Sequence, residues 1–195
     1  MEHNKDKRVI RTKALLIRSL SALMKQKNIK DITVKELCEY ADINRGTFYL
    51  HYKDIYDMLD SIEQELSEKF LQIFQKYNSE TNEDFPYPLF LEIFKLVDDN
   101  AELFRVLIGP NGDISFIMKI FKLYNIHCLQ SEFNKLSPQF SMNQVYYSNF
   151  ILYGCVGLIE QWLSRDTKES PEKMAELITK LVSTGVLSLF NMSDD

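Results

Sequence analysis

Hydrophobic side chains recur every three or four residues along most of the chain, which is the spacing of one face of an α-helix. No stretch alternates apolar and polar residues over several positions, as a half-buried strand does. The pattern predicts an all-α protein of about nine helices. Their expected ranges are 7–27, 34–40, 45–52, 55–77, 86–97, 100–108, 114–136, 142–163 and 171–190.

Two of the short helices are predicted together with their N-terminal caps. Thr33 precedes the helix at 34–40, and Glu36 follows three residues later, which is the pattern of a capping box. Asn44 is a suitable N-cap for the helix at 45–52, after a short turn. Two helices joined in this way form a helix-turn-helix, whose second helix can enter the major groove of DNA.

The helix at 45–52 has an apolar side and a polar side. Phe48 and Tyr52 lie four residues apart, on the side that suits packing under the first helix of the chain. The positions expected to point outward are Arg45, Gly46, Thr47, Tyr49, His51 and Lys53. Their donors can bind phosphate oxygens or base edges, and a glycine allows close approach of the backbone.

Charge is distributed unevenly along the chain. Residues 1–53 contain 12 Lys and Arg against 6 Asp and Glu, a net charge of +6. Residues 54–195 contain 11 against 22, a net charge of −11, so that the total is −5. A basic first segment attracts polyanions, and an acidic remainder repels them. We therefore expect two domains, at 1–53 and 54–195.

Composition adds a few further constraints. Six Gly and five Pro are few and favour long helices. Three Cys are too few for a disulfide framework and indicate reduced thiols. The N-terminus has no signal-peptide pattern, and the longest apolar run, 150–159, is far shorter than the roughly 20 residues of a membrane span. We therefore expect a cytoplasmic protein without a membrane segment.

The sequence lacks the common motifs of catalysis and metal binding. It contains no G-x-G-x-x-G, P-loop, H-E-x-x-H or G-x-S-x-G motif. His127 and Cys128 are adjacent, but no second His or Cys follows at the spacing of a metal ligand. We expect no enzymatic activity, no metal and no cofactor.

The segment from Thr33 to Lys53 resembles the DNA-binding signature of the TetR family of transcriptional regulators. The capping Thr33, Ala41 before the turn, Ile43 in the turn and the Thr-Phe-Tyr-x-His-aromatic series from Thr47 all agree with the family pattern. The resemblance implies a helix-turn-helix domain followed by a helical domain that dimerises and often holds a small ligand. The implied phosphate-binding residues are Thr33, Thr47, Tyr49, His51 and Lys53.

The same resemblance implies that Arg45 and Gly46 approach the bases, with Arg45 as a reader of guanine, while Asn44 belongs to the same DNA-binding surface. Three positions depart from the family pattern. Cys38 replaces a small residue, commonly Ala, and Tyr52 replaces the commoner Phe. Ile55 stands where the family often has a phosphate-binding Lys, so one contact is missing unless Lys53 or Arg11 supplies it.

In the TetR family the last two helices form the dimer interface, which here places it at 142–163 and 174–190. The expected interface residues are Tyr153, Gly154, Gly157, Leu158, Trp162, Leu181, Val182 and Leu189. Each of them could instead fill the core of one subunit. Two recognition helices must reach successive major grooves, ~34 Å apart, which also favours a homodimer.

The C-terminal part contains many aromatic and other large apolar residues at helical spacing: Phe90, Phe94, Phe104, Phe116, Met118, Phe121, Tyr124, Phe133, Tyr146, Tyr147, Phe150 and Trp162. This stripe is typical of a hydrophobic core, and the alternative is an apolar pocket for a small-molecule effector of unknown identity. The candidate ligand contacts are Phe94, Phe104, Arg105, Phe121, His127, Asn149 and Gln161.

Together these features favour a homodimeric repressor that binds a palindromic DNA operator and is released when an effector tilts the helix at 55–77. One alternative is a transcriptional activator that responds to a protein partner. The stretches 103–113 and 154–163 are similar to a branch of the family in which some members regulate dihydroxyacetone kinase genes. A second alternative is a helical adaptor that binds only proteins.

Overall fold

The computed structural model describes residues 2–78, 87–109, 114–126, 140–165 and 169–191. Over these ranges the chain forms nine α-helices and one short 3-10 turn without any strand, so the predicted all-α class is confirmed. In chain order the elements are α1 (Glu2–Met24), η1 (Ile29–Asp31), α2 (Val34–Tyr40), α3 (Arg45–Tyr49), α4 (Ile55–Asn78), α5 (Tyr87–Asp99), α6 (Ala101–Leu107), α7 (Ile114–Tyr124), α9 (Phe140–Ser164) and α10 (Pro171–Asn191).

The helices belong to two compact units. The first comprises Met1–Leu66 and Glu102–Phe116, and the second comprises Ser67–Ala101 and Ile117–Asp195. The boundary between them therefore passes through α4, and α6 belongs to the first unit although it lies far along the chain. The expected division into domains at 1–53 and 54–195 stays a prediction.

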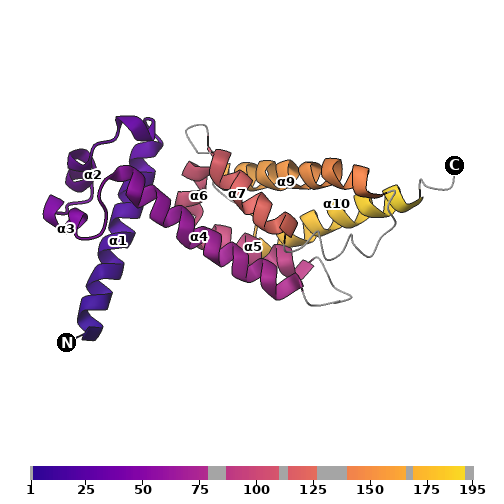
Figure 1. Cartoon of the computed structure of the whole chain (residues 1–195), viewed down its shortest axis with the longest axis horizontal. Coiled ribbons are helices and arrows are strands. Elements are labelled where there is room, and N and C mark those ends of the chain that lie inside the picture. The colour runs from indigo at the N-terminus through magenta and orange to yellow at the C-terminus, as the bar shows by residue number, and fades with distance from the viewer. Residues whose placement is uncertain (1, 79–86, 110–113, 127–139, 166–168, 192–195) are drawn as a thin grey trace. The chain divides into compact units, whose positions relative to one another are not determined.

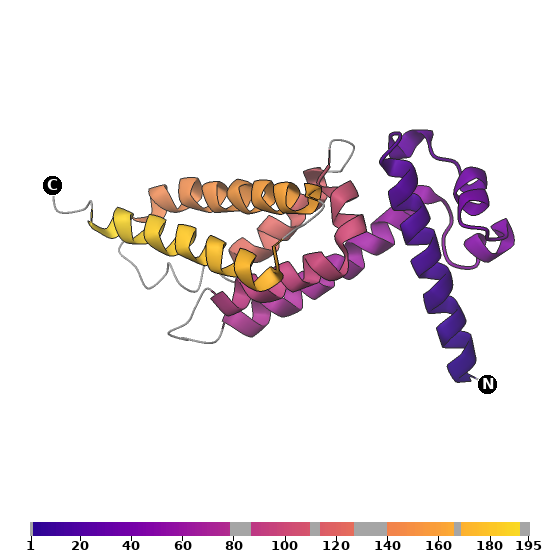
Figure 2. The same ribbon diagram turned by 180° about the vertical axis from the view of Figure 1, so that it is seen from behind.

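The first unit is built around the apolar side of α1. Leu16, Leu20 and Leu23 are at most 4% exposed. α2 packs on α1, and α3 packs on α2, as both views of the chain show (Figures 1 and 2). Leu37 of α2 and Phe48 of α3 are completely buried in this core. Because burying one such side chain contributes roughly 1.5–3 kcal/mol, packing rather than helix length holds the short helices in place.

Local hydrogen bonds fix where α2 and α3 begin. The Oγ1 of Thr33 accepts the N–H of Glu36 at 3.2 Å, and the Oδ1 of Asn44 accepts the N–H of Gly46 at 2.7 Å. Both predicted N-caps are therefore confirmed. Instead of completing a capping box, the Glu36 carboxylate binds the Nζ of Lys27 at 2.5 Å, which ties α2 to the chain that follows α1.

The turn between α2 and α3 is narrow. Asp42 has a φ of 53°, in the left-handed region that Asp tolerates better than most residues. The N–H of Ile43 then donates to the carbonyl of Cys38 at 2.9 Å. Cys38 itself is 2% exposed, and burial raises the pKa of its thiol. It packs as a small apolar residue in the core, as its position in the signature requires.

α3 is shorter than predicted: it ends at Tyr49, whereas the sequence predicted an end near Tyr52. The N–H of His51 donates to the carbonyl of Phe48, three residues back, so the hydrogen bonding there has tightened to 3-10 spacing. The next helix is capped by Asp54, whose Oδ1 accepts the N–H of Asp57 at 2.9 Å.

The second unit contains the pairing of α5 with α10. Phe94 and Val97 of α5 and Ala175 and Ile178 of α10 are at most 3% exposed. The Nζ of Lys95 lies 3.6 Å from a carboxylate oxygen of Glu172, across the same pair of helices. The predicted helices at 86–97 and 171–190 are thus confirmed, and they pack against each other.

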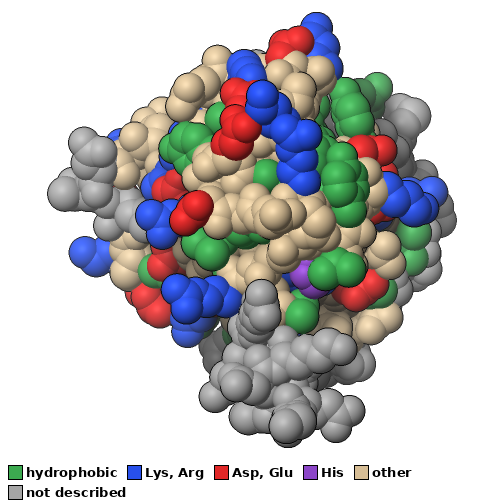
Figure 3. Space-filling view, turned by 90° about the vertical axis from the view of Figure 1, so that its left-hand side faces the viewer, with side chains coloured by type: hydrophobic (Ala, Val, Ile, Leu, Met, Phe, Trp, Pro, Cys, Tyr) green, Lys and Arg blue, Asp and Glu red, His purple; other side chains and the backbone are tan. Residues whose placement is uncertain are grey.

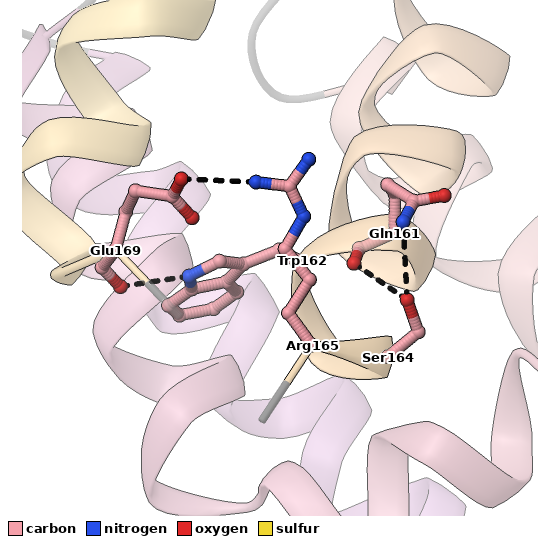
Figure 4. Close-up of polar contacts among 5 residues, drawn as sticks. All are labelled: Gln161, Trp162, Ser164, Arg165 and Glu169. Atoms are coloured by element: carbon pink, nitrogen blue, oxygen red, sulfur yellow. Dashed lines mark hydrogen bonds and ion pairs between the residues drawn. The ribbon is translucent and has the colours of Figure 1, made fainter. Parts of the chain in front are cut away.

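The end of α9 is joined to the chain before α10 by polar contacts (Figure 4). Trp162 donates its indole N–H to the carbonyl of Glu169 at 2.8 Å, and Arg165 forms an ion pair with the carboxylate of Glu169 at 3.1 Å. Gln161 instead pairs with Ser164 on its own helix. The Trp162 ring is 2% exposed and meets Phe94 edge-on, with ring centroids 5.3 Å apart.

The predicted apolar stripe is only partly a core. Its members at Phe90, Phe94, Phe104, Phe116 and Trp162 are buried. That interpretation is wrong for Met118, Tyr146 and Phe150, which are 42%, 74% and 71% exposed. The side chains of Phe133 and Tyr147 lie outside the described residues, as does the end of the helix predicted at 114–136 beyond residue 126.

Candidate nucleic-acid interface

α3 and the residues that follow it expose most of the positions that the sequence singled out. Arg45, Gly46 and Lys53 are exposed and Tyr49 is 58% exposed, while Thr47 and His51 are half-buried. Phe48 and Tyr52, expected on the opposite side, are 0% and 5% exposed. The predicted division of this helix into a packed side and an open side is therefore confirmed.

The buried aromatic rings hold α3 and the following residues against the rest of the unit. The centroid of Phe48 lies 5.5 Å from that of Tyr49 and 5.7 Å from that of Tyr52. The Nζ of Lys13 in α1 sits over the Tyr52 ring at 6.0 Å, within the range of a cation–π contact. Burial, followed by the nearby Glu65 and Asp57 carboxylates, raises the pKa of the Tyr52 phenol. Tyr52 thus fixes the end of the motif as a neutral ring.

Thr33 and Asn44 are exposed at the starts of their helices. Each uses a side-chain oxygen to cap its helix, so each has a shown structural role. The amide nitrogen of Asn44 carries two further donors. Binding of DNA by these two residues stays a prediction.

The burial of Ile55 explains why this position departs from the TetR pattern. It is 4% exposed, so it belongs to the core of the first unit and cannot be replaced there by a solvated cation without loss of packing. Lys53 and Arg11, the two candidates for the missing phosphate contact, are both exposed. The backbone N–H of Lys53 donates to the Asp57 carboxylate at 2.8 Å, which fixes the backbone from which that lysine projects.

Charged and apolar groups are mixed on the surface of the first unit. Figure 3 shows hydrophobic side chains lying among Lys and Arg side chains on the face that it presents. Lys35 and Glu39 form a loose pair at 3.9 Å on α2, with both side chains more than half exposed. Such a pair contributes at most about 1 kcal/mol and leaves both charges in contact with solvent.

The sequence analysis overlooked Leu50. It lies directly after Tyr49, and its side chain is 80% exposed. Helical spacing already placed it opposite Phe48 and Tyr52, but as an apolar residue among polar ones it was not counted with the outward groups.

The residues predicted for a dimer interface lie in different environments. Tyr153, Gly154, Gly157 and Leu181 are exposed, and a Cβ added at either glycine would meet no atom within 4 Å. The half-buried members are Leu158 and Val182. Trp162 is the exception, because its ring lies in the core of its own subunit, which was the competing interpretation. The side chain of Leu189 lies outside the described residues.

Two exposed residues of α9, which the sequence analysis placed in the apolar stripe and not in the interface, extend the same helix face. Tyr146, Phe150 and Gly154 follow one another at four-residue steps, and Tyr153 lies three residues after Phe150, which places all four on one stripe. On α10, Leu177 is 43% exposed and precedes Leu181 by four residues. The spacing could have found them, but it could not tell an outward apolar stripe from an inward one.

The candidate ligand contacts are divided between the two units. Phe104 and Arg105 belong to the first unit, where Arg105 forms an ion pair with Glu102. The other described candidates, which belong to the second unit, are Phe94, Phe121, Asn149 and Gln161. Gln161 is exposed and bonds to Ser164, so it is not a buried polar handle. His127 lies outside the described residues.

Two general expectations can be compared with the described part of the chain. There, no group of three or more His, Cys, Asp or Glu side chains gathers as a metal site requires. A search of the same residues for a helix of the length and apolar character needed to cross a membrane finds none.

The fold and the exposed second helix define a helix-turn-helix protein, and comparisons with known proteins identify its family. The family model described as a transcriptional regulator C-terminal region, of the TetR type, matches residues 84–184. This match covers more than half of the chain, which therefore belongs to the TetR family of transcriptional regulators. The family is a class of regulators and not of enzymes.

A curated relative and several solved structures resemble the chain. The HTH-type transcriptional regulator YxbF of Bacillus subtilis (strain 168) is 24% identical over 176 residues. This alignment covers 85% of the chain, which spans only 43% of the length of that relative.

Among solved structures, the fatty acid degradation regulator FadR from Bacillus halodurans matches with a TM-score of 0.63 and 15% identity, over 88% of this chain and 94% of that one. A TetR transcriptional regulator from Streptococcus agalactiae 2603V has a TM-score of 0.57 and 18% identity, over 93% and 99%. The dihydroxyacetone kinase operon activator DhaS has a TM-score of 0.56 and 16% identity, over 90% and 96%. At these identities the matches show a shared fold.

Proposed function

We propose that this chain is a homodimeric repressor that binds a palindromic operator in double-stranded DNA through α3 and its capping residues. The observation that carries the proposal is the orientation of α3. Phe48 is fully buried, whereas Arg45 and Tyr49 are exposed on a unit whose first 53 residues have a net charge of +6. The apolar side anchors the helix, and the opposite side offers the donors that phosphates and base edges accept.

The proposed contacts divide into two kinds. Thr33, Thr47, Tyr49, His51 and Lys53 bind phosphate oxygens and set the position of the protein on the duplex. Arg45 and Gly46, with Asn44 at the helix start, lie toward the bases, and the fork of Arg45 pairs with a guanine. Arg11 or Lys53 supplies the phosphate contact that Ile55 cannot make.

The proposed dimer forms through the exposed apolar stripe of α9 together with α10. Tyr146, Phe150 and Tyr153 are 74%, 71% and 54% exposed, which is costly for a protein that stays monomeric. Gly154 and Gly157 leave open space for a partner helix beside these rings. Leu177 and Leu181 contribute the corresponding apolar area on α10. We leave Trp162 out of this interface because its own subunit covers it.

The proposed release of DNA depends on α4. A small effector bound by the C-terminal helices tilts α4, which changes the spacing of the two DNA-binding domains in the dimer and lowers the affinity for the operator. The effector acts only through its different affinities for the two conformations.

Activation of transcription is the second candidate for the sign of regulation. Among the proteins that share this fold, DhaS is a dihydroxyacetone kinase operon activator and FadR is a fatty acid degradation regulator. DNA binding is common to both signs. A reporter gene placed behind the bound sequence distinguishes them, because a repressor lowers its expression and an activator raises it.

DNA binding is tested by titrating a fluorescent duplex with the purified full chain at several salt concentrations. Neutralised phosphates release counterions, so affinity should fall steeply between about 50 and 200 mM salt. Lys53→Ala should reduce the steepness by about one counterion, whereas the matched change Lys119→Ala, at an exposed lysine of α7 in the second unit, should leave it unchanged. Binding that ignores salt, or no binding, would favour the protein-binding adaptor.

A further inference from the structure

The side chain of Leu50 is 80% exposed, more than any other large hydrophobic side chain in the described part of the chain. A lone exposed leucine is ordinary on a protein surface. This one, however, is part of the motif that presents the proposed DNA-reading groups. Its position therefore needs to be compared with theirs.

Leu50 lies at the C-terminal end of α3, on the side opposite its buried residues. Its φ of −70° and ψ of −19° continue the helical geometry past Tyr49, and its N–H donates to the carbonyl of Gly46 at 3.2 Å. At about 100° per residue, Leu50 is turned roughly 180° away from the midpoint of the buried Phe48 and Tyr52. Leu50 is therefore exposed on the side of α3 opposite its buried rings.

Gly46 lies one helical turn before Leu50 on the same outer side. It is exposed and has no side chain, so a duplex can come close to the helix at this point. If the duplex comes close to the helix at Gly46, the Leu50 methyl groups lie against the base edges in the major groove. The flanking groups, Thr47 and Tyr49, supply hydroxyls on either side, so the leucine is an apolar point within a polar and cationic surface.

The major groove of DNA contains one apolar group, the C5-methyl of thymine. We propose that Leu50 contacts a thymine C5-methyl group in each half of the operator and thereby selects thymine at that position. This inference rests on the proposed DNA-binding function and deepens it. Charge complementarity supports the choice of occupant, because Arg45 and Lys53 are exposed on the same helix-turn-helix as Leu50 and favour a polyanion over an apolar protein surface.

The test uses duplexes enriched from a random pool by the purified full chain. Each thymine of an enriched half-site is replaced in turn by deoxyuridine, which removes only the C5-methyl group. Loss of one methyl contact should weaken binding about fourfold, and loss in both half-sites should weaken it about fifteenfold. Binding is followed by fluorescence anisotropy at a fixed salt concentration.

The variant Leu50→Ala tests whether Leu50 is the residue that makes the methyl contact. The variant should bind the thymine duplex several-fold more weakly than the wild type, and it should no longer distinguish thymine from deoxyuridine at the selected position. Leu15→Ala, at another exposed leucine of the first unit, should keep the wild-type distinction. Circular dichroism melting confirms that both variants are folded.

Three results would overturn the inference. Wild-type protein that binds thymine and deoxyuridine equally at every position makes no methyl contact, although its DNA-binding function stands. A Leu50→Ala variant that keeps the full preference for thymine assigns the contact to another residue. Absence of any enriched duplex removes the proposed function, and this inference with it.

Discussion

Arg45 and Phe48 are three residues apart on α3, and their side chains have different roles because one is exposed and the other is buried. Phe48 is fully buried and anchors the helix, while Arg45 is exposed at its first turn. The guanidinium also lowers the pKa of the Cys38 thiol, against the larger effect of burial. The charge thus stands at the edge of the core and can reach outward.

Arg45→Ala should cost ~1–3 kcal/mol of binding free energy at the operator and relax the preference at one base pair. The physical reason is the loss of a bidentate pair with guanine. Selection of duplexes by the variant, followed by anisotropy titrations, measures both effects. Lys53→Ala is the control, because the loss of a phosphate contact weakens binding to every sequence alike. An equal loss on all sequences for Arg45→Ala would reassign it to the DNA backbone.

The residue scale also shows what the sequence could and could not predict. Phe48 and Tyr52 were assigned correctly because they are four apart and share a helix face. Tyr146 and Phe150 have the same spacing, but they are exposed. Periodicity tells which residues share a side of a helix, whereas burial depends on which other segment covers that side.

At the scale of elements, short helices depend on their caps. α3 has five residues, and the Oδ1 of Asn44 accepts the N–H of Gly46 at its start. Asn44→Ala should lower the free energy of unfolding by about 1 kcal/mol, within a range of roughly 0.5–2. Urea denaturation followed by circular dichroism measures this loss.

Asn44→Asp is the matched control for the cap, since a carboxylate oxygen also accepts the backbone N–H and is favoured at a helix N-terminus. It should retain stability near that of the wild type. An alanine variant as stable as the wild type would contradict the role of the cap. Caps of this kind are local, which is why Thr33 and Asn44 could be predicted from the sequence.

The contact between the chain after α1 and α6 has a predictable dependence on pH. The hydrogen bond from Lys25 is the main reason that the pKa of Glu102 lies below its ordinary value of 4.5. A lowered carboxyl pKa adds stability that is present above the ordinary pKa and is lost as the pH falls through the lowered one. Because both side chains are about half exposed, the contribution is below about 1 kcal/mol.

Glu102→Gln should therefore destabilise the protein slightly at pH 7, and the difference from the wild type should shrink in acid, below pH 4.5. Urea unfolding at both pH values measures the change. Glu176→Gln, at an exposed carboxylate of α10, is the control and should show no such convergence. A difference that grows in acid would have the wrong sign for this ion pair.

α6 also shows where prediction of elements stopped. Its helix was expected to follow a cap at Asn100 and to end near Ile108, and it is found at Ala101–Leu107, so local signals located it within one residue at each end. Its membership of the first unit was not expected, because the segment follows α5 in the chain. That assignment comes from contacts between residues distant in sequence, such as Lys25 with Glu102, and local patterns carry no information about them.

At the scale of the whole molecule, binding to two successive major grooves requires two copies of the chain. The 195-residue chain should scatter light as a particle of about twice 23.0 kDa. Phe150→Asp places a charge in the middle of the exposed stripe of α9 and should shift the protein toward the monomer and weaken operator binding. Met118→Asp, at an exposed apolar residue of α7, should leave both unchanged. A Phe150→Asp variant that stays dimeric would place the interface elsewhere.

Selection of random DNA duplexes by the purified full-length chain, followed by sequencing, tests the central claim most directly. A dimer with two outward α3 helices should enrich an inverted repeat. The centres of its half-sites should be separated by about 10–10.5 base pairs or a multiple of that spacing. Enrichment of an unpaired half-site, or of no sequence, would contradict the proposal that twin copies of this helix read DNA.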